Sequence, residues 1–499
     1  MPAEDSPTSS GTQARDDATA PLAPLRFHQK LLYGLGEGGE GVKNTALQIF
    51  LFFYYIQVVG LSGSLCGLAL FLALLVDGFS DPLVGVISDR FRSRWGRRHL
   101  FLYAAPIPLA IAILLLFSPP AGWPQWALFA WLLVFAIAAR LSMTFYYVPH
   151  MALGAELSED YRERLAVGGY RMLFSHIGRL VCLVAAFSVF FVATPTYSNG
   201  QLNPDAYQPF AFFCGLAVIA FVMVSAVGTQ KRALAIYHRL DANRAHTANL
   251  MAVWVGFFNA LKLKSFFGLF MGLLVMYIFG GTQTALALHI NTYYWGLTPQ
   301  QTQFVFYAQL AGFIVGIPLA RPLAARLDKK MAYMCCVGGS CVVVSIPVFL
   351  RLLGLFPENG HPLVLPVWAL ANLGYGIIGA SSGILSAAML ADIADEYDLK
   401  YGDRAEGLFF GAVAFSSKAS IGLGGALAGV LLDVINFPRT PKLIVVPDDT
   451  LWRLGLVYGP VLLLILFLGL SFVRRYDLTR ERHAAVLEAI NQRRAVAAA

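Results

Sequence analysis

Charged residues are scarce in this chain, and their scarcity excludes the ordinary classes of soluble protein. They make up 13% of the 499 residues, whereas hydrophobic residues make up 57%. Soluble domains usually carry about 25% charged residues. So little charge, with so many apolar side chains, is typical of a protein that lies in a lipid bilayer.

The usual signatures of ATP-driven pumps and of enzymes are also missing. No glycine–lysine dipeptide occurs, so the chain has no phosphate-binding P-loop. The stretch 34–39 matches GxGxxG, but no predicted strand precedes it, and glycine packing within a membrane helix is the better interpretation. The histidines are scattered, the six cysteines lie in apolar runs, and neither shows a metal-ligand spacing. We therefore expect no enzyme activity, no metal site and no cofactor.

Apolar runs long enough to cross a bilayer, which takes roughly 20 residues each, are abundant. We count twelve, at about 42–60, 63–88, 99–117, 124–150, 169–193, 208–229, 265–291, 302–325, 331–353, 363–390, 407–434 and 453–474. Only helices and closed barrels span lipid, and these runs lack the alternating pattern of barrel strands. The sequence therefore predicts an all-α membrane protein with twelve transmembrane helices.

Basic side chains are distributed unevenly between these runs. Lysine and arginine gather after the second and eighth runs, in the linker 230–263 and after the last run, whereas segments 118–125 and 195–207 contain neither. Because cytoplasmic loops collect positive charge, we expect both termini in the cytoplasm. Arg439 and Lys442 in the last outer loop are exceptions. The net charge of +8 is explained by these loops, so no nucleic-acid partner is expected.

A spacing pattern repeats in the two halves of the chain. Gly85 precedes Arg90 by five positions and Gly316 precedes Arg321 by five positions, each time after the second helix of a half. Such a repeat favours two six-helix halves around a site near the midplane, the major facilitator layout. The predicted parts are a disordered cytoplasmic tail, an N-terminal half, a cytoplasmic linker, a C-terminal half and a second cytoplasmic tail, at residues 1–28, 29–229, 230–263, 264–475 and 476–499.

Two aspartates lie in the middle of the second apolar run. Asp77 and Asp81 are four residues apart, so they share one face of a helix. An ionised carboxylate near the bilayer centre costs about 3 kcal/mol on insertion scales. Two like charges at this spacing repel, so either one is protonated or a cation lies between them. The pattern predicts an ion site, and hence transport coupled to Na⁺ or H⁺.

Several motifs together resemble those of one transporter family. They are Lys30–Gly36, Asp77–Pro82, Ser93–Arg97, Val148–Pro149, Ala152–Leu153, Arg162–Arg164 and Ala391–Tyr397. Over residues 28–475 the chain resembles the glycoside–pentoside–hexuronide:cation symporters, the melibiose permease-like family of the major facilitator superfamily. Eukaryotic sodium-dependent lysolipid transporters share the pattern. The resemblance implies secondary active symport of a small organic solute.

The resemblance also implies where the coupling cation binds. The family's cation site falls on Asp77, Ser80, Asp81 and Thr144, and Lys418 matches a family lysine beside that site. The ammonium group of Lys418 could neutralise a carboxylate when the ion has left. The alternative is a permanent ion pair between aspartate and lysine that holds the two halves together.

The family's sugar-binding residues carry over only in part. Its two acidic residues correspond to Gly41 and Tyr147, and its stacking tryptophan corresponds to Met151. A galactoside grip of the melibiose type is therefore not expected. Arg171 does match a family arginine in the fifth helix.

Polar residues also recur at helical spacing on the first, fourth and seventh predicted helices. Arg140 lies on one such stripe, where it could bind a substrate carboxylate or pair with Glu37 or Glu40. The stripes suit a cavity for a hydroxyl-rich solute, but they could instead form hydrogen bonds between packed helices. The candidates for substrate contact are Glu40, Asn44, Gln48, Arg140, Tyr147, Met151 and Arg171, with Tyr277, Gly281, Thr284 and Asn291 facing them from the seventh helix.

Charges at the inner helix ends resemble the cytoplasmic gate of major facilitators. The candidates are Asp89, Arg90, Arg94 and Arg97 after the second helix, and Asp392 and Asp395 at the inner end of the tenth. We expect the two groups to pair when the cytoplasmic side closes. The alternative is solvated loop charge, which contributes little.

The favoured function is alternating-access uptake of a sugar or glycoside with Na⁺ or H⁺, across the inner or plasma membrane. One alternative is a lysolipid:sodium symporter, which the apolar side chain of Met151 would permit. Another is a membrane sensor that binds solute without transporting it. We expect a monomer whose partners are the lipid bilayer and a small-molecule solute.

Overall fold

The computed structural model describes residues 24–158, 160–239, 250–402, 406–439 and 446–498, and these contain helices but no strands. The first half comprises α2 (Phe27–Thr45), η1 (Ala46–Phe50), α3 (Leu51–Phe53), η2 (Tyr54–Val58), α4 (Gly63–Arg90), α5 (His99–Ala104), α6 (Pro106–Leu116), α7 (Gln125–Glu156), α8 (Tyr161–Ala185), η3 (Ala186–Phe190), η4 (Gly200–Leu202), η5 (Pro204–Ala206) and α9 (Tyr207–Arg239).

The second half follows a short helix, α10 (Leu250–Leu261), which lies in the predicted linker. It comprises α11 (Lys264–His289), η6 (Ile290–Tyr294), α12 (Pro299–Gly316), η7 (Ile317–Leu319), α13 (Ala320–Arg326), α14 (Lys329–Leu352), α15 (Val364–Tyr401), α16 (Glu406–Val434), α17 (Asp448–Leu456), η8 (Val457–Val461) and α18 (Leu462–Val473). A last helix, α19 (Arg480–Ala498), lies where a tail was expected.

Eleven helical segments of the described chain are long and apolar enough to cross a membrane. They coincide with eleven of the twelve predicted apolar runs, and their ends differ by at most seven residues, except that α15 continues to Tyr401, eleven residues beyond the predicted end at 390. The twelfth span is the continuous segment α2–η1–α3–η2, which runs from Phe27 to Val58. Within the described residues the fold is therefore the predicted one, an all-helical protein with twelve spanning segments in two halves.

The first helix extends well before the apolar run that was counted from residue 42. The helix begins at Phe27, fifteen residues earlier, and these residues are polar and glycine-rich rather than apolar. From Tyr33 onward most of them are nevertheless buried, because α2 packs along α8 and α9. A Cβ atom on Gly41 would lie 2.1 Å from the Ser175 backbone oxygen, and one on Gly178 would lie 2.0 Å from that of Gly38. Only glycine permits this approach. Within the stretch 34–39, a Cβ atom on Gly34 would lie 2.9 Å from Tyr170 Cβ, and one on Gly38 would lie 2.7 Å from the Phe221 ring, as the packing interpretation anticipated.

Side-chain caps fix several helix starts beside the loops. The hydroxyl of Ser62 accepts a hydrogen bond from the Leu65 amide at the start of α4. The carboxylate of Asp160 accepts one from the Arg162 amide at the start of α8, and Thr298 forms a capping box with Gln301 at the start of α12. Such caps satisfy amide groups that have no partner within the helix.

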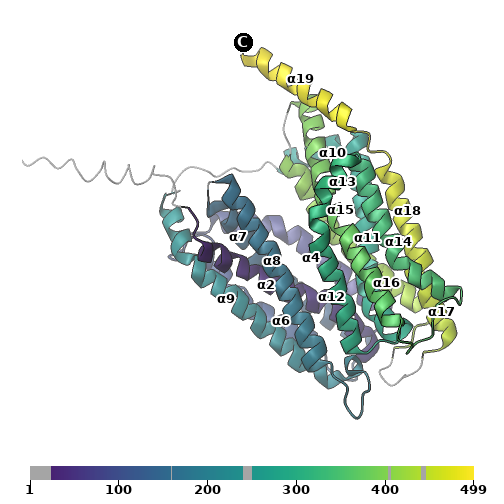
Figure 1. Ribbon diagram of the computed structural model, residues 1–499. Helices are drawn as coiled ribbons and strands as arrows, with labels where there is room; N and C mark the ends of the chain where they lie inside the picture. The colour runs from purple at the N-terminus through teal and green to yellow at the C-terminus, as the bar shows by residue number, and fades with distance from the viewer. Residues whose placement is uncertain (1–23, 159, 240–249, 403–405, 440–445, 499) are drawn as a thin grey trace, which may run out of the picture.

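The two halves form two helical bundles that lie side by side (Figure 1). The bundles diverge toward the end that carries α10 and α19, and they approach each other at the opposite end (Figure 1). There α4 and α16 pack so closely that a Cβ atom on Gly429 would lie 1.9 Å from the Gly63 backbone oxygen. The Asp433 carboxylate also accepts hydrogen bonds from Gly63 and Ser64 across this contact. The protein is thus closed at one end and splayed at the other.

Candidate functional site

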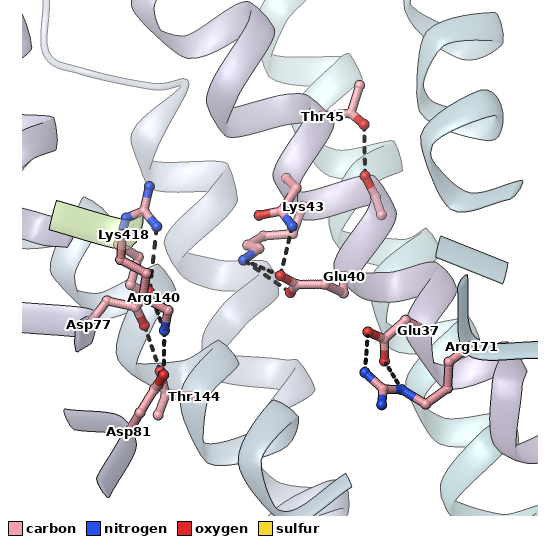
Figure 2. Close-up of polar contacts among 12 residues, drawn as sticks. Glu37, Glu40, Lys43, Thr45, Asp77, Asp81, Arg140, Thr144, Arg171 and Lys418 are labelled. Atoms are coloured by element: carbon pink, nitrogen blue, oxygen red, sulfur yellow. Dashed lines mark hydrogen bonds and ion pairs between the residues drawn. The ribbon is translucent and has the colours of Figure 1, made fainter. Parts of the chain in front are cut away.

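The carboxylates of Asp77 and Asp81 lie near the middle of α4, where α4 faces α16 of the other half. Lys418 of α16 reaches both of them: its Nζ atom is 3.0 Å from Asp77 Oδ2 and 2.5 Å from Asp81 Oδ2 (Figure 2). Asp77 is buried, whereas Asp81 and Lys418 are half-buried. One ammonium group therefore bridges two acidic side chains and the two halves of the molecule.

Thr144 of α7 completes this cluster from the N-terminal half. Its hydroxyl donates a hydrogen bond to Asp77 Oδ1 at 2.7 Å and lies 3.3 Å from Asp81 Oδ1 (Figure 2). Ser80 is buried beside them, but its hydroxyl donates to the backbone oxygen of Asp77 at 2.9 Å. Of the four residues expected to bind the cation, three therefore contact one another through their side chains.

Arg140 contacts a carboxylate other than the two expected for it. Its Nη1 atom is 3.7 Å from Asp77 Oδ2, so its nearest acidic partner is neither Glu37 nor Glu40. Two aspartates, Lys418 and Arg140 together carry no net charge when all are ionised. The low dielectric of a membrane interior favours such a balance, because an isolated ion there is costly.

A second charged cluster lies within the N-terminal half. Glu37 of α2 accepts hydrogen bonds from Arg171 of α8, with Oε1 to Nη2 at 3.1 Å (Figure 2). The ring of His150 lies 3.5 Å from the other oxygen of Glu37 and stacks on Tyr33. Arg171 was expected to contact substrate, but in this conformation it links two helices of one half.

Two further candidates on the first helix also bond locally. Glu40 accepts a hydrogen bond from Lys43 at 3.2 Å (Figure 2). It also accepts one from Asn44 at 2.7 Å. Tyr147 is half-buried beside Glu37 and Arg171, whereas the side chain of Met151 is 38% exposed. The polar stripe on α2 therefore serves contacts within the half, as the alternative interpretation allowed.

Two cavities lie between the halves and share Thr284 and Tyr375 in their walls. One, of about 270 Å³, is lined by Gln48 and Arg140 from the N-terminal half and by residues of α11, α15 and α16. The other, of about 170 Å³, is lined mainly by amide and aromatic side chains of the C-terminal half. Of the seven substrate candidates, Gln48 and Arg140 line the larger cavity. The residues expected on the seventh helix line both cavities: Tyr277, Gly281 and Thr284 line the larger one, and Thr284 and Asn291 line the smaller one.

Arg179 in the wall of the smaller cavity was missed by the sequence reasoning. It is a charged residue in the middle of the fifth apolar run and is therefore as costly to bury in the bilayer as Asp77. Gln283, Gln309 and Asn372 were missed as well. Neutral amides in apolar runs are common at helix contacts, and no spacing pattern distinguished these.

The gate candidates pair within their own halves in this conformation. Arg97 Nη2 is 3.0 Å from Glu156 Oε1, and Asp392 Oδ2 is 2.7 Å from Lys329 Nζ. His483 of α19 lies 3.1 Å from Asp395. The expected pairing of Asp392 and Asp395 with arginines of the other half thus stays a prediction for a state with the splayed end closed.

Arg98 is the main partner of Asp89, and it was not a candidate. Its Nη2 atom is 2.6 Å from Asp89 Oδ1 and 2.9 Å from Glu156 Oε1. Arg94 instead lies over the ring of Trp95, and Arg90 is exposed. Sequence spacing alone could not select Arg98, because the loop contains several arginines at adjacent positions.

Comparison with known proteins agrees with this architecture. The family model described as "MFS/sugar transport protein" matches residues 32–480. An uncharacterized symporter of Synechocystis sp. is 24% identical, with 94% of this chain and 97% of the relative covered. A putative glycoside/cation symporter of Escherichia coli is also 24% identical, with 95% and 97% covered. The mouse sodium-dependent lysophosphatidylcholine symporter 1 is 24% identical over 92% of this chain and 87% of its own length.

Solved structures show the same fold at low sequence identity. A single-site mutant of the nucleoside transporter NupG aligns with a TM-score of 0.62 at 14% identity, covering 90% of this chain and 99% of its own. The xylose transporter XylE from E. coli, in an inward-open conformation, aligns with a TM-score of 0.59 at 14% identity, covering 93% and 99%. The fold is that of the major facilitator superfamily, and the chain belongs to its MFS/sugar transport protein family.

Proposed function

We propose that this protein is a cation-coupled symporter that moves a sugar or glycoside by alternating access. The observation that carries the proposal is the bridge from Lys418 to Asp77 and Asp81, because it joins an acidic site in one half to a basic group in the other. The residues assigned to the cation site are Asp77, Ser80, Asp81 and Thr144.

Charge balance links the bound cation to the contact between halves. With Lys418 and Arg140 in place, the two aspartates are neutralised. A monovalent cation bound by the carboxylates and by the hydroxyl of Thr144 would leave the cluster with one excess positive charge. Lys418 is then the basic group that moves away from the carboxylates. Hard cations favour such oxygen ligands. Lys418 thus acts as the internal substitute for the ion when the carrier returns empty.

The splayed end of the molecule is assigned to the cytoplasm. It carries the basic segments that the positive-inside rule places there, together with both described ends of the chain (Figure 1). A cysteine introduced at exposed Glu488 of α19 should react with a membrane-impermeant maleimide only after cells are permeabilised, and one at exposed Glu358 should react in intact cells. Labelling in the reverse order would overturn this orientation.

The solute class rests on two supports. Relatives include proteins named isoprimeverose transporter and glucuronide carrier protein homolog, which are 24% and 22% identical to this chain. The smaller cavity is rich in amide side chains, which suit hydroxyl-rich molecules and not an acyl chain. These supports favour a sugar over a lysolipid.

The deciding experiment is uptake into proteoliposomes that contain the purified full-length chain. Radiolabelled monosaccharides and glycosides are offered with an inward Na⁺ gradient, with an inward proton gradient, and with neither. We expect accumulation above the external concentration only with one of the gradients. Solute that binds but never accumulates would indicate a sensor, and gradient-driven uptake of a lysolipid alone would replace the sugar assignment.

A further inference from the structure

Arg179 differs from the other basic residues around the central cavities. Arg140 lies 3.7 Å from Asp77, Arg171 lies 3.1 Å from Glu37, and Lys418 contacts both aspartates of α4. Among the described residues, by contrast, no carboxylate forms an ion pair with Arg179, and its main electrostatic neighbour is Tyr375. A guanidinium group without a counter-charge at membrane depth is costly, and residues of that kind mark substrate paths.

The surroundings of Arg179 form a built cavity. Its volume is about 170 Å³, and the described residues that line it include no aspartate or glutamate. Amide side chains of Gln283 and Gln309 face it, and so do the aromatic rings of Trp368 and Tyr375. Trp368 is held in place because its Nε1 atom donates to Asn291 Oδ1 at 2.7 Å. The site thus combines one fixed positive charge with amide donors and flat rings.

We propose that Arg179 binds a carboxylate of the solute, so that the transported sugar is an acidic one. This inference rests on the proposed function and specifies its substrate class. A planar guanidinium binds a carboxylate through two parallel hydrogen bonds, which gives both strength and orientation. The amides then contact hydroxyl groups, and the rings pack against the apolar face of the sugar.

The charge of the site selects a carboxylate over a phosphate monoester. A phosphate monoester carries about −1.5 to −2 charges at neutral pH, whereas a carboxylate carries one. Arg179 is the one basic residue among the described residues that line this cavity, so its single charge matches a carboxylate. Arg140, the earlier candidate for this role, already contacts Asp77.

The position of Arg179 also couples this contact to transport. Arg179 lies on α8 of the N-terminal half, whereas nearly all other lining residues belong to the C-terminal half. A carboxylate bound to Arg179 while its sugar contacts Gln309 and Trp368 would bridge the two halves. Solute binding therefore favours closure of the splayed end around the cavity.

The test compares matched acidic and neutral sugars. Equilibrium binding to the purified full-length chain is measured for methyl β-glucuronide against methyl β-glucoside, for the galacturonide against the galactoside, and for glucose 6-phosphate. Variants are Arg179→Gln, Arg179→Lys and, as a control on the same helix, Arg162→Gln, whose side chain is exposed. We expect at least one acidic sugar to bind about tenfold to a hundredfold more tightly than its neutral partner.

That preference should disappear in Arg179→Gln, survive in part in Arg179→Lys and remain intact in Arg162→Gln. Unchanged binding of the neutral partner in Arg179→Gln would show that the variant is folded. Equal binding of acidic and neutral partners, a preference that persists in Arg179→Gln, tighter binding of the phosphate, or no binding by any sugar would each overturn the inference. Gradient-driven uptake of a neutral sugar in preference to its acidic partner would refute the inference while leaving the symporter proposal intact. Arg179-dependent binding of an acidic sugar without gradient-driven uptake of any sugar would refute the symporter proposal while leaving the assignment of Arg179 intact.

Discussion

Asp77 and Asp81 share their neutralising groups unequally. Asp77 contacts Lys418, Arg140 and Thr144, whereas Asp81 contacts Lys418 and, at the longer distance of 3.3 Å, Thr144. Removing the charge of either residue leaves the cluster with an excess positive charge in the apolar interior. The two residues should therefore both be needed to bind a cation, with Asp77 contributing more to stability.

We predict that Asp77→Asn and Asp81→Asn each reduce gradient-driven accumulation of solute by about tenfold or more, because loss of one charged ligand costs at least about 1.4 kcal/mol of cation binding. Accumulation in vesicles is measured at equal amounts of protein. The control is Asp449→Asn, whose carboxylate is exposed and pairs with Arg453. Normal accumulation by both variants would remove the cation site from α4.

At the residue scale, the sequence located the charged side chains of the central cluster better than it predicted their partners. A carboxylate in an apolar run is visible in any sequence, so Asp77 and Asp81 could be found. Whether Arg140 meets Glu37 or Asp77 depends on how α7 is rotated against α2 and α4, which spacing along one helix does not determine. Arg179 was overlooked, although it too is a charged residue within an apolar run.

The contact between α4 and α16 is the main seal at the closed end of the molecule. It depends on small residues, because Gly63 and Gly67 of α4 lie directly against Gly429 and Ala426 of α16. The Asp433 carboxylate strengthens it by accepting hydrogen bonds from two amides and one hydroxyl of α4. Opening of this end therefore requires α16 to separate from α4 along the same interface that contains Lys418.

Enlarging Gly429 should weaken this seal. A Cβ atom at Gly429 would lie 1.9 Å from a backbone oxygen of α4, so Gly429→Val must force the helices apart. We predict faster alkylation, by a maleimide added outside, of a cysteine introduced at Thr292, which is buried at the same end. The control is Gly411→Ala on the same helix, where an added Cβ meets no atom within 4 Å. Equal alkylation rates in the two variants would mean that this contact does not seal the outer end.

At the element scale, apolar runs located eleven helices well, because a span must be long and apolar whatever its neighbours are. They failed for the first half of α2, where glycines and buried polar groups take the place of apolar side chains. They also missed α19, which has no apolar run.

Asp477 lies in the short segment between α18 and α19. Burial opposes ionisation of Asp477, but the Ser265 hydroxyl and the Arg482 guanidinium outweigh this effect and hold the pKa of the carboxyl below its usual range.

The whole molecule can alternate between two conformations only if each conformation gives its buried charged groups a partner of opposite charge. In this conformation the carboxylates of α4 are neutralised by Lys418, and the closed end is sealed a few turns away on the same pair of helices. An empty carrier without Lys418 would hold two carboxylates, and among the described residues Arg140 would be the one basic group left in an ion pair with them. Its reorientation would then carry uncompensated charge through a low-dielectric interior, which raises the barrier.

We therefore predict that Lys418→Ala slows the return of the empty carrier more than it slows exchange between loaded states. Net uphill uptake should fall by about tenfold or more, while substrate counterflow in the same vesicles falls much less, because a bound cation replaces the missing ammonium group only in loaded states. Lys262→Ala, an exposed lysine near the start of α11, serves as the control. Equal losses in uptake and counterflow would instead support a permanent ion pair that merely holds the halves together, and no loss in either would remove Lys418 from the transport cycle.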